Sequence, residues 1–292
     1  MRRLALALAV LACTAPAASA FDAATAPTKV VRVGAVRVAY RSIGSGRPLV
    51  LVMGLSGTMD AWPPSFVDAL VRGGHRVVLL DNQGVGRSTM QPGTLSVRRM
   101  ADTTARLIAK LRLRRPDVAG WSMGGMIVQS LLVRHPGIAR RAALLSTAPG
   151  DGYLAAPDPD AVASLDNGDT AGLIGLLFGS AASASALTDY GADIARRAGF
   201  APVASAAVST QQIAASGVWL AGRDPDGAKI GRLRLPVLVA GGKEDRLLPV
   251  GNQIHIARTI PHVVYVDYPH AAHGFFIQEA AAFVPRLLRF LR

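Results

Sequence analysis

The stretch "VAGWSMGGMIVQS", residues 118–130, decides the fold. A short apolar run ends in it, a serine stands between two glycines, and an apolar stretch with helical spacing follows. Residues 120–124 fit the pattern G-x-S-x-G, which holds a serine on a strained turn between a strand and a helix. The flanking glycines keep side chains away from the strand and helix that crowd this turn. The Ser122 hydroxyl is therefore predicted to stand clear of a sheet, at the carboxyl end of a strand.

Other short apolar runs rich in Val, Leu and Ile recur along the chain, separated by helical or glycine-marked stretches. They lack strict apolar–polar alternation, which indicates strands buried on both faces, as in a parallel sheet between two helix layers. Residues 29–46 alternate around a glycine and predict an antiparallel hairpin ahead of them. The sequence thus predicts the α/β class, with a doubly wound, mostly parallel sheet. The predicted buried strands are residues 48–53, 75–81, 116–121, 141–146, 235–242 and 262–268.

One interval interrupts this alternation of strands and helices. Residues 150–232 contain no convincing strand and are rich in Ala, Gly and Ser. A bare loop of this length is uncommon in a compact domain, and the patch "LIGLLF" favours packed structure. We predict a helical cap over residues 150–232, inserted into a catalytic domain formed by residues 21–149 and 233–292. The low complexity of the interval leaves partial disorder as the alternative.

Residues 1–20 have the layout of a secretory signal peptide. A basic start, "MRR", precedes a short apolar run, and "APAASA" ends in a small-x-small cleavage site after Ala20. The apolar run is too short to span a bilayer, and no later stretch offers about 18 unbroken apolar residues. We therefore expect an exported protein, periplasmic or extracellular, without a membrane span after signal removal. The alternative is lipidation at "VLAC", with Cys13, the only cysteine, as the new N-terminus.

The formal net charge is +13. A basic surface is one signature of nucleic-acid or membrane binding. The arginines look scattered, however, apart from a group on the predicted helix at residues 96–115, where they fall mainly off the apolar face. We interpret that group as a solvated helix face and expect no nucleic-acid partner. The sequence also predicts no metal and no cofactor, because it has no H-E-x-x-H, no Cys/His cluster, and no phosphate-binding fingerprint after a strand.

A nucleophilic serine needs a base and an acid that orients the base. Two histidines lie in "YPHAAHGFF", a predicted loop between the last strand and the C-terminal helix. His273, which a glycine follows, is the predicted base, and His270 is the alternative. In "GGKEDRLLP", which follows a predicted strand, Asp245 is the predicted acid. Asp151 also follows a predicted strand and is the alternative acid.

The stretch "LVMGLSGTMDAW", residues 51–62, runs from a strand end into a glycine-containing loop. Backbone N–H groups there can join that of Met123 in holding the negative oxygen of a tetrahedral intermediate. Leu55 is the predicted donor in this loop, and Ser56 is the alternative.

These motifs together resemble those of the α/β-hydrolase fold-1 family of serine esterases. The resemblance rests on "VMGLSG", "DNQGVGRS", "GWSMGG", "GGKEDRLLP" and "AHGFF", and covers residues 30 to 150 and 232 to the end. The order Ser, Asp, His along the chain matches that family. Two positions depart from it: Met53 stands where many relatives have histidine, and Gln83 stands where arginine is frequent.

The resemblance implies a serine hydrolase that cleaves carboxylic esters or lactones through an acyl-serine intermediate, and the apolar cap implies a small, apolar ester substrate. Acyl transfer, or cofactor-free perhydrolysis of the haloperoxidase kind, needs the same three side chains and is an alternative. A non-catalytic binding protein on a hydrolase scaffold is a second alternative. Ser122 argues against epoxide opening and dehalogenation, because the relatives that perform them carry aspartate at this turn.

Overall fold

The structure, a computed structural model, describes residues 21–166, 172, 175–201 and 203–292. Within these residues, eight strands form one sheet in the order β1-β2-β4-β3-β5-β6-β7-β8. β1 and β2 form antiparallel pairs with their neighbours, and β3 to β8 run parallel. This confirms the predicted doubly wound, mostly parallel sheet. The strands are β1 Lys29–Val33, β2 Val36–Ile43, β3 Arg47–Val52, β4 His75–Leu80, β5 Asp117–Trp121, β6 Ala142–Leu145, β7 Val237–Gly242 and β8 Val263–Tyr268.

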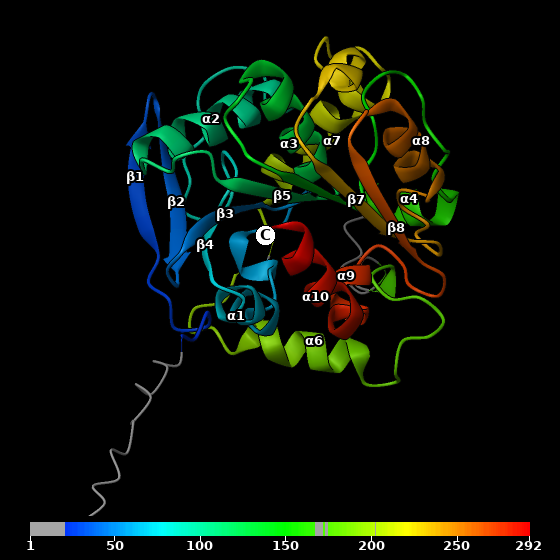
Figure 1. Cartoon of the computed structure of the whole chain (residues 1–292), viewed down its shortest axis with the longest axis horizontal. Helices are drawn as coiled ribbons and strands as arrows, with labels where there is room; N and C mark the ends of the chain where they lie inside the picture. Colours follow the sequence, from blue (N-terminus) through cyan, green and yellow to red (C-terminus); the bar gives the residue numbers. More distant parts are fainter. Residues whose placement is uncertain (1–20, 167–171, 173–174, 202) are drawn as a thin grey trace, which may run out of the picture.

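Helices cover both faces of the sheet (Figure 1). On one face lie α2 (Val97–Lys110), α3 (Met123–Arg134), α7 (Ala206–Leu220) and α8 (Gly251–Thr259). On the other lie α1 (Pro64–Arg72), α6 (Ala186–Ala195), α9 (Phe275–Gln278) and α10 (Ala280–Phe290). The remaining elements of the described residues are α4 (Pro159–Asp166) and two 3-10 helices, η1 (Met59–Ala61) and η2 (Gly227–Arg232).

Each central strand contributes side chains to both helix layers. In β3, Val50 and Val52 pack into the core beneath α2 and α3, whereas Leu49 and Leu51 pack into the core beneath α1 and α10. Successive side chains of a strand point to opposite faces, and here both faces are covered. This explains why the strands appear as continuous apolar runs in the sequence.

The predicted signal peptide, residues 1–20 with Cys13, lies outside the described residues. In the described part of the chain, no helix has the length and apolarity needed to cross a membrane.

The chain between β6 and β7 carries α4, α6, α7 and η2, and it returns to the main body at several points. The carboxylate of Asp60 in η1 pairs with two buried guanidiniums, those of Arg41 on β2 and Arg197 just after α6. The Asp60–Arg197 distance is 3.2 Å. Burial, with the nearby Arg41 charge, lowers the pKa of Arg197 to about 10. The middle of the predicted cap, just after α6, is therefore held to the main body by a buried charge cluster. Its domain boundaries remain a prediction.

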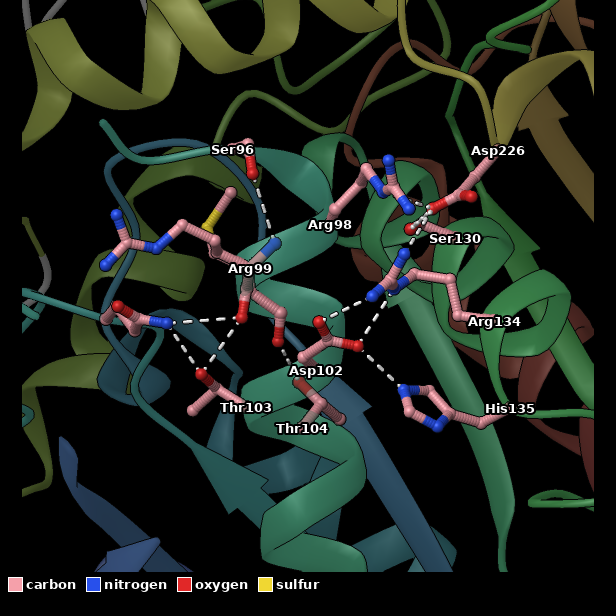
Figure 2. Close-up of polar contacts among 12 residues, drawn as sticks. Ser96, Arg98, Arg99, Asp102, Thr103, Thr104, Ser130, Arg134, His135 and Asp226 are labelled. Atoms are coloured by element: carbon pink, nitrogen blue, oxygen red, sulfur yellow. Dashed lines mark hydrogen bonds and ion pairs between the residues drawn. The ribbon is translucent and has the colours of Figure 1, made fainter. Parts of the chain in front are cut away.

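The carboxyl end of the predicted cap is held by polar contacts of Asp226, the residue before η2 (Figure 2). The buried carboxylate of Asp226 accepts a hydrogen bond from the Ser130 hydroxyl at 2.8 Å and lies 3.2 Å from Nε of Arg98. Arg134 lies 3.6 Å from the same carboxylate. The charged side of α2 therefore does not face only solvent, because Arg98 and Arg134 connect α2 and α3 to the segment that leaves the cap.

Asp102 on α2 extends this network (Figure 2). Its carboxylate accepts two hydrogen bonds from Arg134, at 2.8 and 2.7 Å, and lies 2.8 Å from Nε2 of His135. Burial alone raises the pKa of Asp102, but the bonds from Arg134 and His135 outweigh burial and hold the pKa below its ordinary value. A carboxyl group whose pKa falls on folding stabilises the protein above its unfolded pKa. This stabilisation is lost as the pH drops through the folded pKa.

Replacing Asp102 by asparagine removes the charge and keeps the shape. We expect Asp102→Asn to lower the free energy of unfolding at pH 7, because Arg134 and His135 lose an anionic partner. The difference from wild type should shrink as the pH falls below about 4, because the unfolded wild-type chain binds a proton at Asp102 there and the folded chain binds one only at lower pH. Urea unfolding at pH 7 and about pH 3 measures both quantities. Asp160→Asn is the control, since that side chain is 93% exposed. An Asp102→Asn effect that is equal at both pH values would contradict a role for the charge.

Candidate active site

The turn between β5 and α3 holds Ser122 in the left-handed region, with φ 58° and ψ −125°. This backbone conformation is strained for any residue with a side chain. Its neighbours fix it, since Ser122 N donates to the Leu145 carbonyl at 2.9 Å and the Ser122 carbonyl accepts from the Thr147 hydroxyl at 2.7 Å. The side chain of Ser122 is partly exposed at the carboxyl edge of the sheet.

The flanking glycines are needed because backbone segments approach them closely. A Cβ on Gly124 would lie 2.1 Å from the carbonyl oxygen of Val52 at the end of β3. A Cβ on Gly120 would lie 2.2 Å from the carbonyl oxygen of Gly124. Real side chains do not approach backbone this closely, so the G-x-S-x-G pattern is required by the packing of α3 against β3 and β5.

The loops after β7 and β8 bring Asp245 and His273 together. Nδ1 of His273 lies 2.8 Å from Oδ2 of Asp245, and both side chains are buried. The other carboxylate oxygen of Asp245 accepts hydrogen bonds from the backbone N–H groups of Leu247 and Leu248, at 3.0 and 2.9 Å. Because Asp245 is held by its own loop, it can fix the orientation of the imidazole and leave Nε2 free to face a substrate.

The indole of Trp121 connects this histidine loop to the serine turn. Nε1 of Trp121, the residue before Ser122, donates a hydrogen bond to the His273 carbonyl at 3.0 Å. The two rings also lie against each other, with centroids 5.4 Å apart. The structure thus brings the loop of His273 and Asp245 against the turn that carries Ser122. The sequence does not reveal that Trp121 binds the histidine loop, because the pattern G-x-S-x-G accepts any residue at this position.

The loop after β3 lies against the same serine. A Cβ on Gly54 would lie 3.0 Å from Cβ and 3.5 Å from Oγ of Ser122. This places Gly54, the residue before Leu55, against the serine. The N–H of Ser56 is already used, since it donates to Oε1 of Gln212 on α7 at 2.7 Å. Leu55 therefore stays the predicted oxyanion donor of this loop, and Ser56 is not available for that role.

The second predicted donor, Met123, is the first residue of α3. The first N–H groups of a helix have no partner within the helix and carry the positive end of its dipole. The N–H of Met123 is thus placed where negative charge near Ser122 would be stabilised.

The alternative acid and base have partners elsewhere. Asp151 lies 2.7 Å from Nε2 of His255 on α8, and the His255 ring stacks on Tyr153 with centroids 4.1 Å apart. His270 is largely exposed and lies 3.5 Å from Glu244. Neither pair includes His273, so the described contacts favour Asp245 and His273 over Asp151 and His270.

Part of the predicted cap is bonded directly to the histidine loop. The N–H of Gly274 donates to the Leu177 carbonyl at 2.8 Å, and the N–H of His273 donates to the Leu176 carbonyl at 3.4 Å. Nearby, the Glu244 carboxylate accepts two hydrogen bonds from Ser180, one from its backbone N–H at 2.5 Å and one from its hydroxyl at 2.6 Å. No motif in the sequence signals these contacts, because they join residues far apart in the chain.

The two residues that depart from the family pattern, Met53 and Gln83, both make hydrogen bonds within the protein. Met53 is buried, and its carbonyl accepts a hydrogen bond from the Asn82 side chain at 3.0 Å. Gln83 donates to the Thr103 hydroxyl on α2 at 2.6 Å, so it contributes to loop packing. Among the described residues, no group of three or more His, Cys, Asp or Glu side chains is arranged to hold a metal ion.

Comparison with known proteins agrees with this fold. The model of the family described as the alpha/beta hydrolase fold matches residues 47–280, so the chain belongs to that family. A solved structure, an alpha/beta hydrolase fold protein from Chitinophaga pinensis, superimposes with a TM-score of 0.80 at 29% identity, covering 92% of this chain and 98% of that one.

Two curated relatives have more specific names. Over 112 residues the chain is 35% identical to BpoC of Mycobacterium tuberculosis (strain ATCC 25618 / H37Rv), a protein assigned as a non-heme bromoperoxidase. That match covers 38% of this chain and only 42% of the relative's length. The chain is 25% identical over 252 residues to RutD of Rhizobium rhizogenes (strain K84 / ATCC BAA-868), assigned as a carbamate hydrolase. This second match covers 84% of the chain and 93% of the relative.

The close approach at Gly124 gives a direct test of the serine turn. Gly124→Ala should lower the free energy of unfolding by about 1–3 kcal/mol or more, because the added methyl group would overlap the Val52 carbonyl. Gly191→Ala on α6 is the matched control, since a Cβ there meets nothing within 4 Å. It should leave the protein as stable or more stable, by up to about 1 kcal/mol. Urea unfolding compares the two variants, and equal stability of both would show that the packing described for Gly124 is wrong.

Proposed function

We propose that the protein is a serine hydrolase that cleaves carboxylic esters or lactones through an acyl-serine intermediate. The proposal rests on one observation above all. The buried His273–Asp245 pair lies in loops held against the strained turn of Ser122 by the Trp121 indole. Nucleophile, base and orienting acid are the three groups that such a reaction requires.

In the proposed reaction, Oγ of Ser122 attacks the carbonyl carbon of the ester while Nε2 of His273 takes the hydroxyl proton. Asp245 accepts a hydrogen bond from Nδ1 and stabilises the imidazolium that forms. The N–H groups of Leu55 and Met123 hold the negative oxygen of the tetrahedral intermediate. His273 then protonates the leaving alcohol, and water, activated by the same base, releases the acid from Ser122.

The surroundings of the site favour small, apolar substrates. The stretch that meets the histidine loop supplies Leu176, Leu177 and Phe178, and the leucine side chains are buried. The hollow beside the histidine loop is lined by Leu176 and Phe178 but also by Glu244 and Arg246, so the proposal of an uncharged acyl or alcohol group rests on the apolar part of this lining. The predicted signal peptide adds export to the proposal, with cleavage after Ala20, which N-terminal sequencing of the exported protein would test.

A second chemistry has support from one comparison. The chain is 35% identical over 112 residues to a protein assigned as a non-heme bromoperoxidase. Hydrogen peroxide in place of water could release the acyl group from Ser122 as a peracid, which would then oxidise halide. Halide oxidation in acetate buffer with peroxide, measured beside ester hydrolysis, separates the two reactions. Ser122→Ala must abolish both, because both pass through the acyl-serine.

Labelling identifies the nucleophile directly. We expect a fluorophosphonate to form one adduct on the native protein, at Ser122, and none on Ser122→Ala or on heat-denatured protein. The same variant should lose hydrolysis of nitrophenyl esters by about 10³-fold or more. Adduct mapping by mass spectrometry and a chain-length series of these esters provide the measurements. A folded protein with neither label nor turnover would favour the binding-protein alternative.

The two Asp–His pairs allow a matched test of the acid. Asp245→Asn should lower kcat by about 10⁴-fold, because the amide cannot stabilise the imidazolium and favours the wrong tautomer of His273. Asp151→Asn makes the same substitution in the Asp151–His255 pair and should leave kcat within a few-fold of wild type. Steady-state kinetics on one nitrophenyl ester compares them. If Asp151→Asn causes the larger loss, the assignment of Asp245 is wrong.

A further inference from the structure

A groove of about 560 Å³ lies at the opposite edge of the sheet from Ser122. It is bordered by residues that precede the amino ends of three parallel strands: Arg115 before β5, Arg140 before β6 and Arg234 before β7. Ser122, Asp245 and His273 instead follow the carboxyl ends of their strands. The groove is therefore separate from the candidate active site.

The groove combines an apolar floor with a cationic rim. Its floor includes Leu132, Val133, Leu233 and Leu235. Its rim is made of basic side chains, which are Arg115, Arg140, Lys229, Arg232 and Arg234. No aromatic residue borders it among the described residues, so it offers no stacking platform for bases. This composition fits a ligand that is both anionic and apolar.

The positive charge extends well beyond the groove. Residues 111–116, 134–141, 229–236 and 285–292 each contain three arginines or lysines and no carboxylate side chain. We call these four segments the amino-edge surface. Arg140 joins three of them, since its backbone N–H donates to the Pro116 carbonyl at 3.0 Å and its guanidinium donates to the Arg292 carbonyl at 3.2 Å. The fourth segment, residues 229–236, is joined to residues 134–141 through Pro236. The Pro236 carbonyl accepts a hydrogen bond at 3.1 Å from the N–H of Ala142, the residue that follows 134–141.

Most of these charges have no acidic partner. Arg134 pairs with Asp102, and Arg140 pairs with Asp117 at 2.7 Å. The remaining basic side chains form no ion pair with a residue in the described part of the chain; they are Arg112, Arg114, Arg115, Arg141, Lys229, Arg232, Arg234, Arg286, Arg289 and Arg292. Such a concentration of uncompensated charge repels itself and attracts an extended anion.

We propose that the amino-edge surface binds the anionic phospholipid surface of a membrane. Guanidinium groups bind phosphate oxygens in pairs of parallel hydrogen bonds, and the apolar floor of the groove accepts the glycerol and upper acyl region of one lipid. A single soluble anion would use only the groove rim, whereas a lipid surface also uses the cations on the other segments. Bound in this way, the protein turns the edge that carries Ser122 toward the aqueous phase.

Vesicle binding tests the proposal on the full-length mature protein. Binding is measured by co-sedimentation with phosphatidylcholine vesicles that contain or lack phosphatidylglycerol. We expect binding only with phosphatidylglycerol, and its loss at about 0.5 M salt, where the Debye length falls to a few ångströms. The triple variant Arg115→Gln, Arg232→Gln, Arg234→Gln should lower the partition coefficient about 100-fold, since each basic residue near such a surface contributes on the order of 1 kcal/mol.

The matched control is Arg32→Gln, Arg37→Gln, Arg106→Gln. These three arginines are also exposed and lie on β1, β2 and α2, away from the groove. This triple variant makes the same change in net charge and should keep binding within a few-fold of wild type. Ester hydrolysis on a soluble substrate should be unchanged in both variants, which shows that both are folded.

Three results would overturn the proposal. The first is equal loss of binding in the two triple variants, which would mean that net charge alone is responsible. The second is binding to pure phosphatidylcholine that equals binding to the anionic vesicles. The third is binding of monomeric dodecyl phosphate to the groove without any vesicle binding, which would assign the groove to a soluble amphiphile.

Discussion

The close approach of α3 to the end of β3 is the constraint on which the candidate site depends. Gly124 lies against the Val52 carbonyl, and Ser122 adopts a left-handed backbone conformation in the turn between β5 and α3. The sheet core fixes both sides of the contact, because β3 and β5 are adjacent, parallel and buried. Packing that extends through the centre of the molecule thus sets the position of the serine and compensates for the strain of its backbone conformation.

Much of this arrangement follows from local sequence. Apolar runs without alternation identify buried parallel strands, and G-x-S-x-G identifies the turn, because each feature is set by residues that are neighbours in the chain. The pairing of Asp245 with His273 also follows, since both come after strands and the carboxyl ends of parallel strands share one edge. The sequence also favours Asp245 over Asp151, and the structure adds the physical reason, because both aspartates meet a histidine and only the histidine of Asp245 lies beside the serine turn.

What the sequence could not reveal depends on contacts between distant segments. The bond from Trp121 to His273 joins residues 152 positions apart, and that from Ser56 to Gln212 joins residues 156 positions apart. The clustering of the basic residues escapes sequence analysis for the same reason. They look scattered along the chain, but four separate segments gather them at one edge of the sheet. Charge patterning along a sequence cannot show such clustering until the strand order is known.

The contacts of the loop after β3 have one more consequence. Ser56 binds Gln212 and Ser209 on α7, and Gly57 forms a β-bridge with Val203. The loop of Leu55, the predicted oxyanion donor, is therefore tied to α7 and to the chain just before it. A movement of α7 that displaced Ser56 would displace the neighbouring Leu55 amide as well. In the proposed reaction this amide holds the negative oxygen, so α7 has to stay in place while the ester is cleaved.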